Sequence, residues 1–183
     1  GETTEETRHV FIDKARQMDA PIFMAEDEQE IISATTDECN GLLYNTKTYG
    51  EIQGELGGIY QMKNTNTILC AMKRLKDMDM IHDTECIHKG LANVNETTGL
   101  TGRWQQIGSK PMVICDTGHN TGGWKYLSRQ LKAQHYHHTH IVFGMVDDKD
   151  INTVMSMLPK DATYYYTRAT TKRAIEQTKV KLI

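Results

Sequence analysis

The stretch that decides the fold reads KPMVICDTGHNTGGWKYLSRQL and runs from Lys110 to Leu131. Its apolar run, Met112 to Cys115, predicts a buried strand, and the spacing of apolar residues further on predicts a helix over about residues 121–133. Asp116 and His119 stand between the two. A carboxylate and an imidazole in that place are typical of a ligand site in a parallel α/β sheet. Asp116 alone could equally cap the helix or close a turn.

Two further strand–helix pairs follow this one. The residues 140–145 predict a strand and a helix to about Leu158, and the residues 162–167 predict a strand and a helix from about Thr171. Repeats of this length indicate a parallel sheet with right-handed crossovers. Because the carboxyl ends of parallel strands meet at one edge, we expect three polar clusters to share it. They are Asp116–Asn120, Asp147–Asp150 and Thr167–Arg168.

The first half of the chain has a different pattern of predicted helices and strands. The pattern predicts a helix capped by Thr3 with Glu6 three residues later. It then predicts a strand over residues 20–25, two or three strands between 26 and 60, and helices over about 65–78 and 84–93. The polar segment Asn95 to Arg103 reads as a linker, so we divide the chain near residue 98.

The composition excludes several classes of protein. The 183 residues carry a net charge of -3, which does not suggest a basic nucleic-acid surface, and no apolar run is long enough to span a membrane. The four cysteines have no C-x-x-C spacing, so neither a zinc site nor a disulfide framework is expected, and we expect a reduced cytoplasmic protein. The opening GETTEETRHV lacks an initiator Met, which leads us to expect a fragment.

Other candidate motifs carry less weight. The histidines between residues 135 and 140 have irregular spacing, which favours a solvated loop over a metal site. The acidic run Asp147–Asp150 could simply be helix-start acidity. The chain contains no G-x-x-x-x-G-K-[ST], G-x-G-x-x-G or G-x-S-x-G pattern, and taken alone it has no complete catalytic constellation.

Several motifs together resemble one family. The stretch LTGRWQQIGSKPMVICDTGHN is similar to the start of the C-terminal domain of folylpolyglutamate synthase, the bifunctional dihydrofolate synthase included, within the Mur ligase superfamily. The stretches VFGMVDDKDI, TRATTKRAI and GGIYQMKNTNTILCAMKRL resemble other motifs of that family, in the right order over nearly the whole chain. Thr117, Gly118 and Thr121 depart from the usual D-x-A-H-N-P pattern without removing a charged or donor group.

The resemblance implies both a fold and an activity. Residues 1–98 would be the C-terminal portion of the central ATP-binding ligase domain. Residues 99–183 would be the Mur ligase C-terminal domain, a Rossmann-like α/β domain with a mostly parallel sheet, its truncation left open. Enzymes of the family phosphorylate the γ-carboxyl of the folate glutamate tail with ATP, and incoming L-glutamate attacks the acyl phosphate. The second domain would close as a lid about a hinge at Asn95 to Gly102.

The same resemblance assigns roles to five residues. Asn64 matches the asparagine on the adenine side of the nucleotide, Arg103 the arginine that reaches the phosphates, and Asp116 the aspartate that accepts from ribose hydroxyls. His119 and Lys149 resemble catalytic residues near the incoming glutamate or the acyl phosphate. The phosphate-binding loop and the Mg²⁺ ligands of the family lie upstream of residue 1, so no metal ligand is expected in this chain and the fragment alone is expected to be inactive.

The expected partners are small molecules, namely ATP with Mg²⁺, folate or dihydropteroate, and L-glutamate. Neither nucleic acid nor a membrane is expected, and we expect a monomer. The full-length protein would be an ATP-dependent carbon–nitrogen ligase of the tetrahydrofolate synthase type, with dihydrofolate synthase activity left open. Two alternatives remain: another Mur-superfamily amino-acid ligase of cell-wall synthesis, and a non-catalytic nucleotide-binding α/β module.

Overall fold

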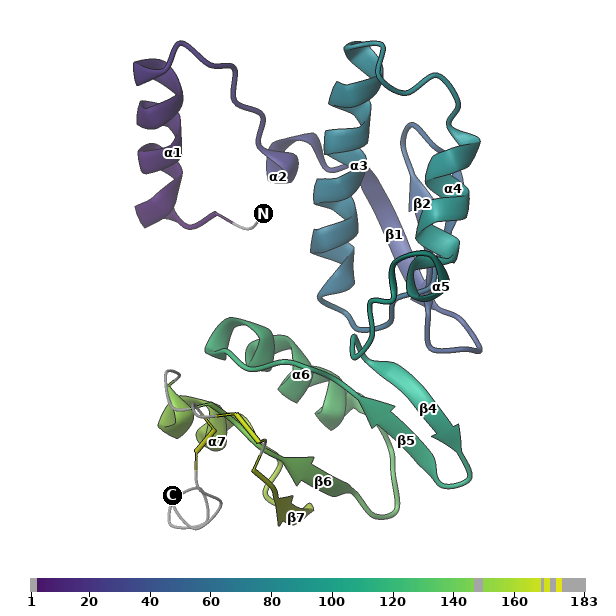
Figure 1. The fold of residues 1–183 in the computed structure, drawn as a ribbon, viewed down its shortest axis with the longest axis vertical. Coiled ribbons are helices and arrows are strands. Elements are labelled where there is room, and N and C mark those ends of the chain that lie inside the picture. Colours follow the sequence, from purple (N-terminus) through teal and green to yellow (C-terminus); the bar gives the residue numbers. More distant parts are fainter. Residues whose placement is uncertain (1–2, 147–149, 169, 172–173, 176–183) are drawn as a thin grey trace. The chain divides into compact units, whose positions relative to one another are not determined.

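The computed structural model describes residues 3–146, 150–168, 170–171 and 174–175, which fold as a mixed α/β chain (Figure 1). They belong to two compact units. Unit 1 comprises Gly1–Gly57 and Gln61–Ile114, and unit 2 comprises Gly58–Tyr60 and Cys115–Ile183. Each unit has its own secondary structure. The domain boundary at residue 98 stays a prediction.

Unit 1 is built on a three-stranded antiparallel sheet in the order β1-β2-β3. Its helices and strands, including β5, which ends at the border with unit 2, are α1 (Glu5–Gln17), α2 (Ala25–Glu28), β1 (Ile31–Thr36), β2 (Leu42–Thr46), β3 (Glu51–Gly54), α3 (Gln61–Asp77), α4 (Glu85–Ala92), α5 (Val94–Thr98), β4 (Gln105–Ser109) and β5 (Met112–Cys115). The predicted strands between residues 26 and 60 and the predicted helices near 65–78 and 84–93 are confirmed.

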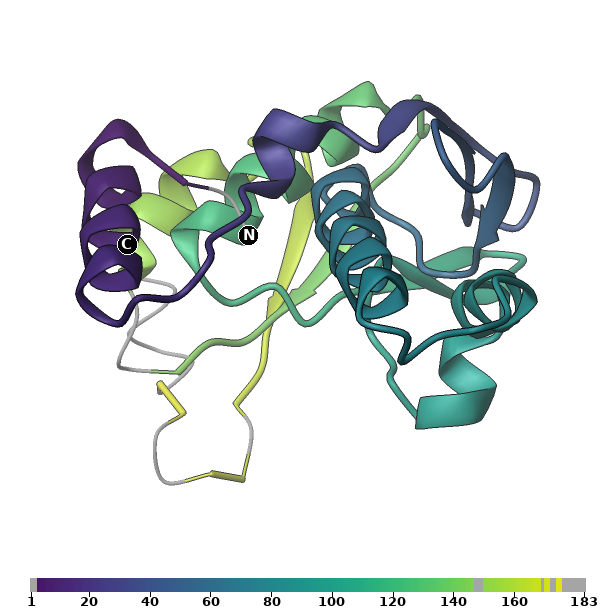
Figure 2. The same cartoon turned by 90° about the horizontal axis from the view of Figure 1, so that it is seen from above.

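The core of unit 1 lies between this sheet and two helices. Tyr44 on β2 stands opposite Ile52 on β3, so both side chains point to the same face of the sheet. Leu69 from α3 and Ile87 from α4 pack against them. Both helices therefore cover one face of the sheet (Figures 1 and 2). The buried Tyr44 hydroxyl accepts a hydrogen bond from Thr65 at 3.1 Å, which satisfies its polar group.

The N-terminal region differs from its prediction in two respects. The helix α1 is capped by Thr4 rather than Thr3, and its partner in the capping box is Thr7 rather than Glu6. The strand predicted over residues 20–25 is wrong, because residues 20–24 form no strand and Ala25 begins α2. The guanidinium of Arg74 lies 4.2 Å from the centre of the Phe23 ring, so a cation covers this half-exposed apolar residue where a strand partner was expected.

The predicted linker is partly helical. The helix α5 covers Val94–Thr98 and ends at Gly99, whose φ of 71° is a conformation that glycine adopts at low cost. The side chain of Glu55, just after β3, accepts a hydrogen bond from the Asn95 amide at 2.7 Å. This bond attaches the start of α5 to the end of the sheet, and residues 99–103 of the predicted linker form neither helix nor strand.

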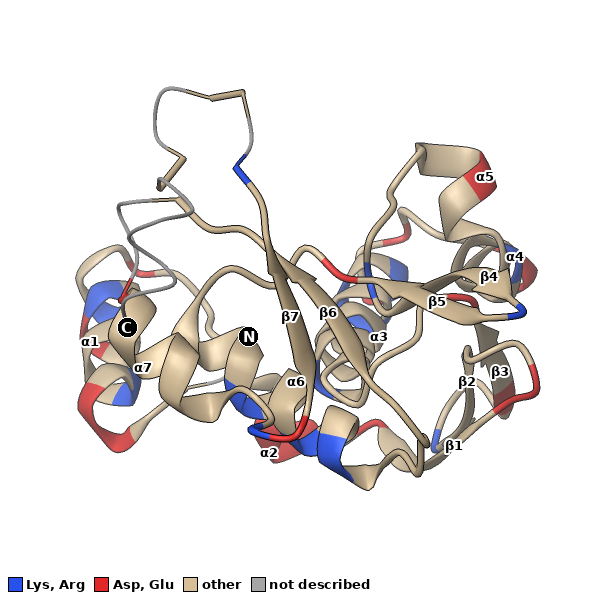
Figure 3. Cartoon of the chain, turned by 90° about the horizontal axis from the view of Figure 1, so that it is seen from below, with Lys and Arg blue, Asp and Glu red and all other residues tan. Residues whose placement is uncertain are grey.

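Unit 2 alternates strands and helices as predicted. It contains α6 (Thr121–Ala133), β6 (His140–Phe143), α7 (Ile151–Met157) and β7 (Thr163–Tyr166). The strands β6 and β7 are parallel, with Phe143 opposite Tyr166. Neither strand carries a Lys, Arg, Asp or Glu (Figure 3). The ring of Trp124 from α6 meets the Phe143 ring edge-on at 5.8 Å, which packs the helix on this strand pair.

The third predicted strand of this sheet pairs elsewhere. The strand β5 exists at its predicted bounds, but it is not buried as predicted, because Met112 and Val113 are 48% and 41% exposed. Its hydrogen-bonded neighbour is β4, reached through a turn at Lys110–Pro111 whose peptide bond is cis. Only β6 and β7 are shown as a parallel pair among the described residues. The helix predicted from Thr171 falls largely outside the described residues; Ala174 forms an isolated bridge with Val146.

Candidate functional site

Asp116 directly follows β5, and both oxygens of its side chain accept hydrogen bonds. The amide of Gly118 donates to Oδ1 at 2.7 Å, which closes a local turn. The hydroxyl of Tyr60 donates to Oδ2, also at 2.7 Å, although it lies 56 positions away in the sequence. Two donors from different segments therefore hold one half-buried carboxylate at the end of a strand.

The loop after Asp116 leads directly into α6. Asn120 caps that helix, since its Oδ1 accepts from the Gly123 amide at 2.7 Å. His119 is exposed, and its Nδ1 lies 3.0 Å from the carbonyl oxygen of Thr117. Because a carbonyl oxygen only accepts, this contact requires the proton on Nδ1, and in the neutral ring Nε2 is then an acceptor.

The backbone of this loop lies close against α6. The indole N–H of Trp124 donates to the Gly118 carbonyl at 3.1 Å. A Cβ on residue 118 would lie 2.3 Å from Cδ1 of Leu127, a buried side chain, so a glycine permits the approach. The helix that follows the loop thus fixes the loop by a hydrogen bond and by close packing.

The segment before α3 belongs to unit 2 with this loop. The amide of Ile59 donates to Oε1 of the buried Gln130 on α6 at 2.8 Å. Gly58 has a φ of +94°, and a Cβ at this position would lie 2.7 Å from the Tyr60 ring. These features place the Tyr60 ring where its hydroxyl reaches Asp116. Sequence reasoning missed Tyr60 as a site residue: it stands inside the quoted stretch GGIYQMKN, but no spacing connects it with Asp116.

The other two predicted nucleotide contacts lie in unit 1. Asn64 is exposed in the first turn of α3, and its Nδ2 donates to Oε1 of Gln61 at 3.0 Å. Arg103 is half-buried and precedes Trp104, a buried residue with a φ of 50°. The structure brings Asp116 and His119 together in one loop of unit 2, and it assigns Asn64 and Arg103 to the other unit.

The remaining predicted clusters follow β6 and β7. Lys149, with Asp147 and Asp148, lies outside the described residues. Asp150 caps α7 by accepting from the Thr153 amide at 3.1 Å, and its hydrogen bonds to the side chain and backbone of Thr153 lower its pKa. Asp150 therefore has the structural role at a helix start that the sequence analysis gave as an alternative for the acidic run. Thr167 donates its amide to the Phe143 carbonyl at 2.9 Å directly after β7.

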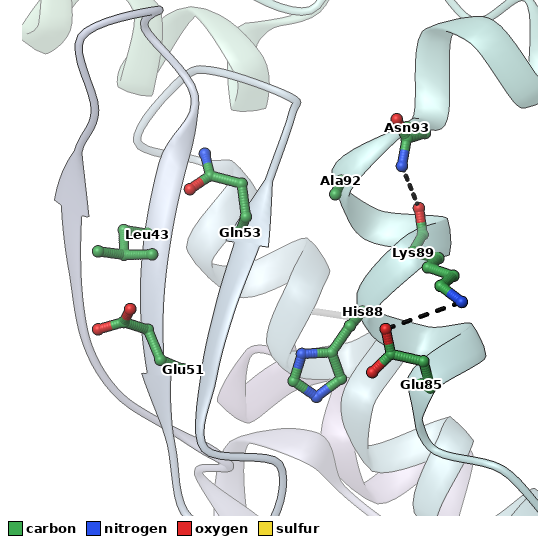
Figure 4. A pocket seen from close by; sticks show the side chains of 8 residues that line it. All are labelled: Leu43, Glu51, Gln53, Glu85, His88, Lys89, Ala92 and Asn93. Carbon is green, nitrogen blue, oxygen red and sulfur yellow. Dashed lines mark hydrogen bonds and ion pairs between the residues drawn. The ribbon is translucent and has the colours of Figure 1, made fainter.

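A shallow pocket of about 360 Å³ lies in unit 1 between β3 and α4 (Figure 4). Two of its charged lining residues pair, since Nζ of Lys89 lies 3.9 Å from Oε1 of Glu85. None of the predicted site residues lines it. Among the described residues, no three His, Cys, Asp or Glu side chains gather as a metal site, and no helix is both long and apolar enough to cross a membrane.

Comparison of the sequence with known proteins finds similarity to the family that the motifs resemble. Residues 102–181 match the family model described as Mur ligase, glutamate ligase domain. A probable bifunctional folylpolyglutamate synthase/dihydropteroate synthase of Haloferax volcanii is 28% identical over 123 residues, which are 67% of this chain and 14% of that protein. A dihydrofolate synthase/folylpolyglutamate synthase of Buchnera aphidicola is 34% identical over 68 residues, which are 37% of this chain and 16% of that protein.

Solved structures extend the likeness to the fold of the whole chain. The folylpolyglutamate synthase of Mycobacterium tuberculosis complexed with ADP is similar with a TM-score of 0.80 and 19% identity, over 100% of this chain and 40% of that one. The folylpolyglutamate synthase of Thermotoga maritima is similar with a TM-score of 0.68 and 22% identity, over 98% of this chain and 42% of that one.

The chain thus spans a minor part of each relative's length, between 14% and 42% of those named here. The solved structures support the fold, and the family model and the sequence relatives show which proteins this chain is similar to. The chain therefore resembles the C-terminal part of the folylpolyglutamate synthase and dihydrofolate synthase family, with the Mur ligase, glutamate ligase domain in residues 102–181.

Proposed function

We propose that this chain is the C-terminal part of an ATP-dependent ligase that adds L-glutamate to folate, and that Asp116 contacts the ribose of ATP. The observation that carries the proposal is the Asp116 carboxylate, held by Tyr60 and Gly118 at the end of β5. A carboxylate fixed at a strand end can accept from the hydroxyls of a ribose. It lies within the residues that match the ligase family model.

The other predicted residues have roles that suit their chemistry. Arg103 would offer forked donors to phosphate oxygens, and the amide of Asn64 would pair with polar atoms of adenine. His119, with its Nε2 as acceptor, and Lys149, as a positive charge, would orient the incoming glutamate. When ATP is bound, it activates the folate carboxyl as an acyl phosphate. Exclusion of water around that group would protect it from hydrolysis.

The proposal includes several features beyond this chain. The Mg²⁺ ligands and the phosphate-binding loop would lie upstream, and the full-length protein would act as a cytoplasmic monomer. A glycine-rich loop of the type G-T-N-G-K-G-S in the gene upstream of residue 1 would support this, whereas a gene product that starts near residue 1 would favour the non-catalytic nucleotide-binding module.

The test is an assay of the full-length gene product with ATP, L-glutamate and three acceptors, namely tetrahydrofolate, dihydropteroate and a muramoyl precursor. We expect mass spectrometry to find a glutamate added to tetrahydrofolate or dihydropteroate. Exclusive use of the muramoyl precursor would instead identify a cell-wall ligase. The purified 183-residue chain should be inactive, and turnover by it would refute that part of the proposal.

A matched pair of variants tests Asp116 itself. We expect Asp116→Asn to lower the activity of the full-length protein at limiting ATP by about tenfold or more. This is the effect of weakening the hydrogen bonds between a charged carboxylate and the ribose hydroxyls. Asp161→Asn is the control, because Asp161 is an exposed aspartate of unit 2 before β7. Equal activity of the two variants would contradict the role of Asp116.

A further inference from the structure

The hydrogen bond between Tyr60 and Asp116 does more than satisfy a polar group. The torsion about the bond between Cβ and Cγ of an aspartate is soft, so each hydrogen bond to its carboxylate restricts the orientation of that group. The Tyr60 hydroxyl at 2.7 Å from Oδ2 adds a second fixed point on the other oxygen. Hydrogen bonds to both oxygens, together with the Cβ–Cγ bond, restrict the plane of the carboxylate, and an ionised carboxylate has about four acceptor positions in that plane.

Tyr60 is itself held in place by its neighbours. The Ile59 amide is bound to the buried Gln130 at 2.8 Å, which fixes the backbone one residue before. Gly58 leaves room for the ring, because a Cβ there would lie 2.7 Å from the Tyr60 Cε1. The hydroxyl is therefore preorganised, and little conformational entropy remains to be lost when it orients Asp116.

We propose that Tyr60 is a positioning residue for nucleotide binding, whose hydroxyl sets the plane of the Asp116 carboxylate for the two ribose hydroxyls. The inference rests on the proposed function. It also connects two predicted contacts along the chain, since α3 starts at Gln61 and carries Asn64 in its first turn. Tyr60 acts on the ribose through Asp116. Removal of its hydroxyl should therefore weaken the binding of nucleotides that carry ribose hydroxyls and leave the binding of nucleotides without them unchanged.

The experiment compares ATP with 2′,3′-dideoxy-ATP in the full-length protein, by calorimetric titration and by steady-state kinetics. We expect Tyr60→Phe to weaken ATP binding about tenfold, the lower part of the range for a hydrogen bond to a charged group. Binding of dideoxy-ATP should stay unchanged. The KM for ATP should rise by the same factor while kcat at saturating ATP and the KM for glutamate stay constant.

Four further variants make the test specific. Tyr164→Phe is the matched control, because it also removes a hydroxyl of unit 2, one that donates to the Pro159 carbonyl, and it should leave ATP binding unchanged. Gly58→Ala keeps the hydroxyl but displaces the ring, and it should reproduce the loss for ATP alone. The double variant Tyr60→Phe/Asp116→Ala should bind ATP no more weakly than Asp116→Ala.

The possible outcomes separate this inference from the function on which it rests. If Tyr60→Phe weakens ATP and dideoxy-ATP equally, or weakens neither, Tyr60 is not a positioning residue. If Asp116→Ala removes the preference for ATP over dideoxy-ATP while Tyr60→Phe retains it, only the present inference fails. If the unmodified protein binds neither nucleotide, the proposed function fails with it.

Discussion

At the scale of single residues, the absence of a side chain at Gly118 allows the Asp116 loop to lie close to α6. A Cβ at position 118 would lie 2.3 Å from Cδ1 of Leu127, which is 3% exposed. We therefore expect Gly118→Ala to destabilise the protein by roughly 1–3 kcal/mol, the usual cost of overpacking. Urea unfolding checks this. The double variant with Leu127→Ala should lose less than the sum of the single variants, and strict additivity would contradict the contact.

Tyr164 provides a second test at this scale, in its titration. Burial, with Tyr166 and Asp161 nearby, raises its pKa from 10.0 to about 12. Because the folded state holds this proton more tightly than the unfolded state, the stability that Tyr164 contributes is complete below about pH 10. It is lost as the pH rises towards 12.

The measurement is an ultraviolet difference titration of the protein against its Tyr164→Phe variant. The missing tyrosine should ionise near pH 12, and the variant should lose less stability between pH 10 and 12. Ionisation of that tyrosine near pH 10 would contradict the burial argument. The hydroxyl of Tyr164 donates to the Pro159 carbonyl, so the variant also tests whether that bond matters for stability.

The sequence led to some of the site residues and not to others, for a physical reason. Asp116 and His119 could be found because a strand end followed by a helix start is a local pattern. Tyr60 could not, because its partner lies 56 positions away and nothing local signals the contact. Their roles in binding or catalysis stay predictions, as do those of Asn64, Arg103 and Lys149.

At the scale of elements, the cap of α6 joins stability to the candidate site. Asn120 accepts from the Gly123 amide at 2.7 Å and directly follows His119. Asn120→Ala should cost about 1 kcal/mol in urea unfolding, the usual loss for a helix N-cap. Asn120→Asp, which keeps the acceptor, should cost little and serves as the control. If both variants were as stable as the unmodified protein, the cap would contribute nothing to stability.

Helices and strands were predicted correctly where the local sequence signals agreed. The prediction failed where contacts with residues distant in the sequence determine the structure. The helix α6 has its predicted bounds because Asn120 caps it and its apolar spacing is regular. The apolar run at 20–25 was too short to distinguish a strand from an exposed segment, and Phe23 lies under Arg74 instead. The strand β5 was found, but its neighbour β4 was not, because the polar residues QQIGS lack an apolar alternation.

At the scale of the whole molecule, the chain divides into two compact units, and unit 1 contains a hydrophobic core of its own. Ile52 is fully buried in unit 1. Ile52→Ala should remove roughly 2–5 kcal/mol from the stability of that unit. Hydrogen exchange read by mass spectrometry should show faster exchange in β1–β3, α3 and α4, with α6 and β6 unchanged.

The reciprocal variant is Val154→Ala, since Val154 is fully buried on α7 of unit 2. Its effect on exchange should be confined to unit 2. If either variant raised exchange in both units to the same extent, the chain would unfold as one cooperative body. The assignment of residues 58–60 to unit 2 is the part of this division that no composition shift in the sequence could have indicated.

The hydrogen bond from the Trp124 indole to the Gly118 carbonyl has a practical consequence. Indole emission depends on the surroundings of the ring and on what its N–H group meets. The chain has two tryptophans, and Trp104 lies in unit 1, so Trp104→Phe leaves one tryptophan, whose indole is bound to the backbone of the Asp116 loop. Ligand-dependent movement of that loop would then appear as a change in wavelength or intensity, in solution and without an attached dye.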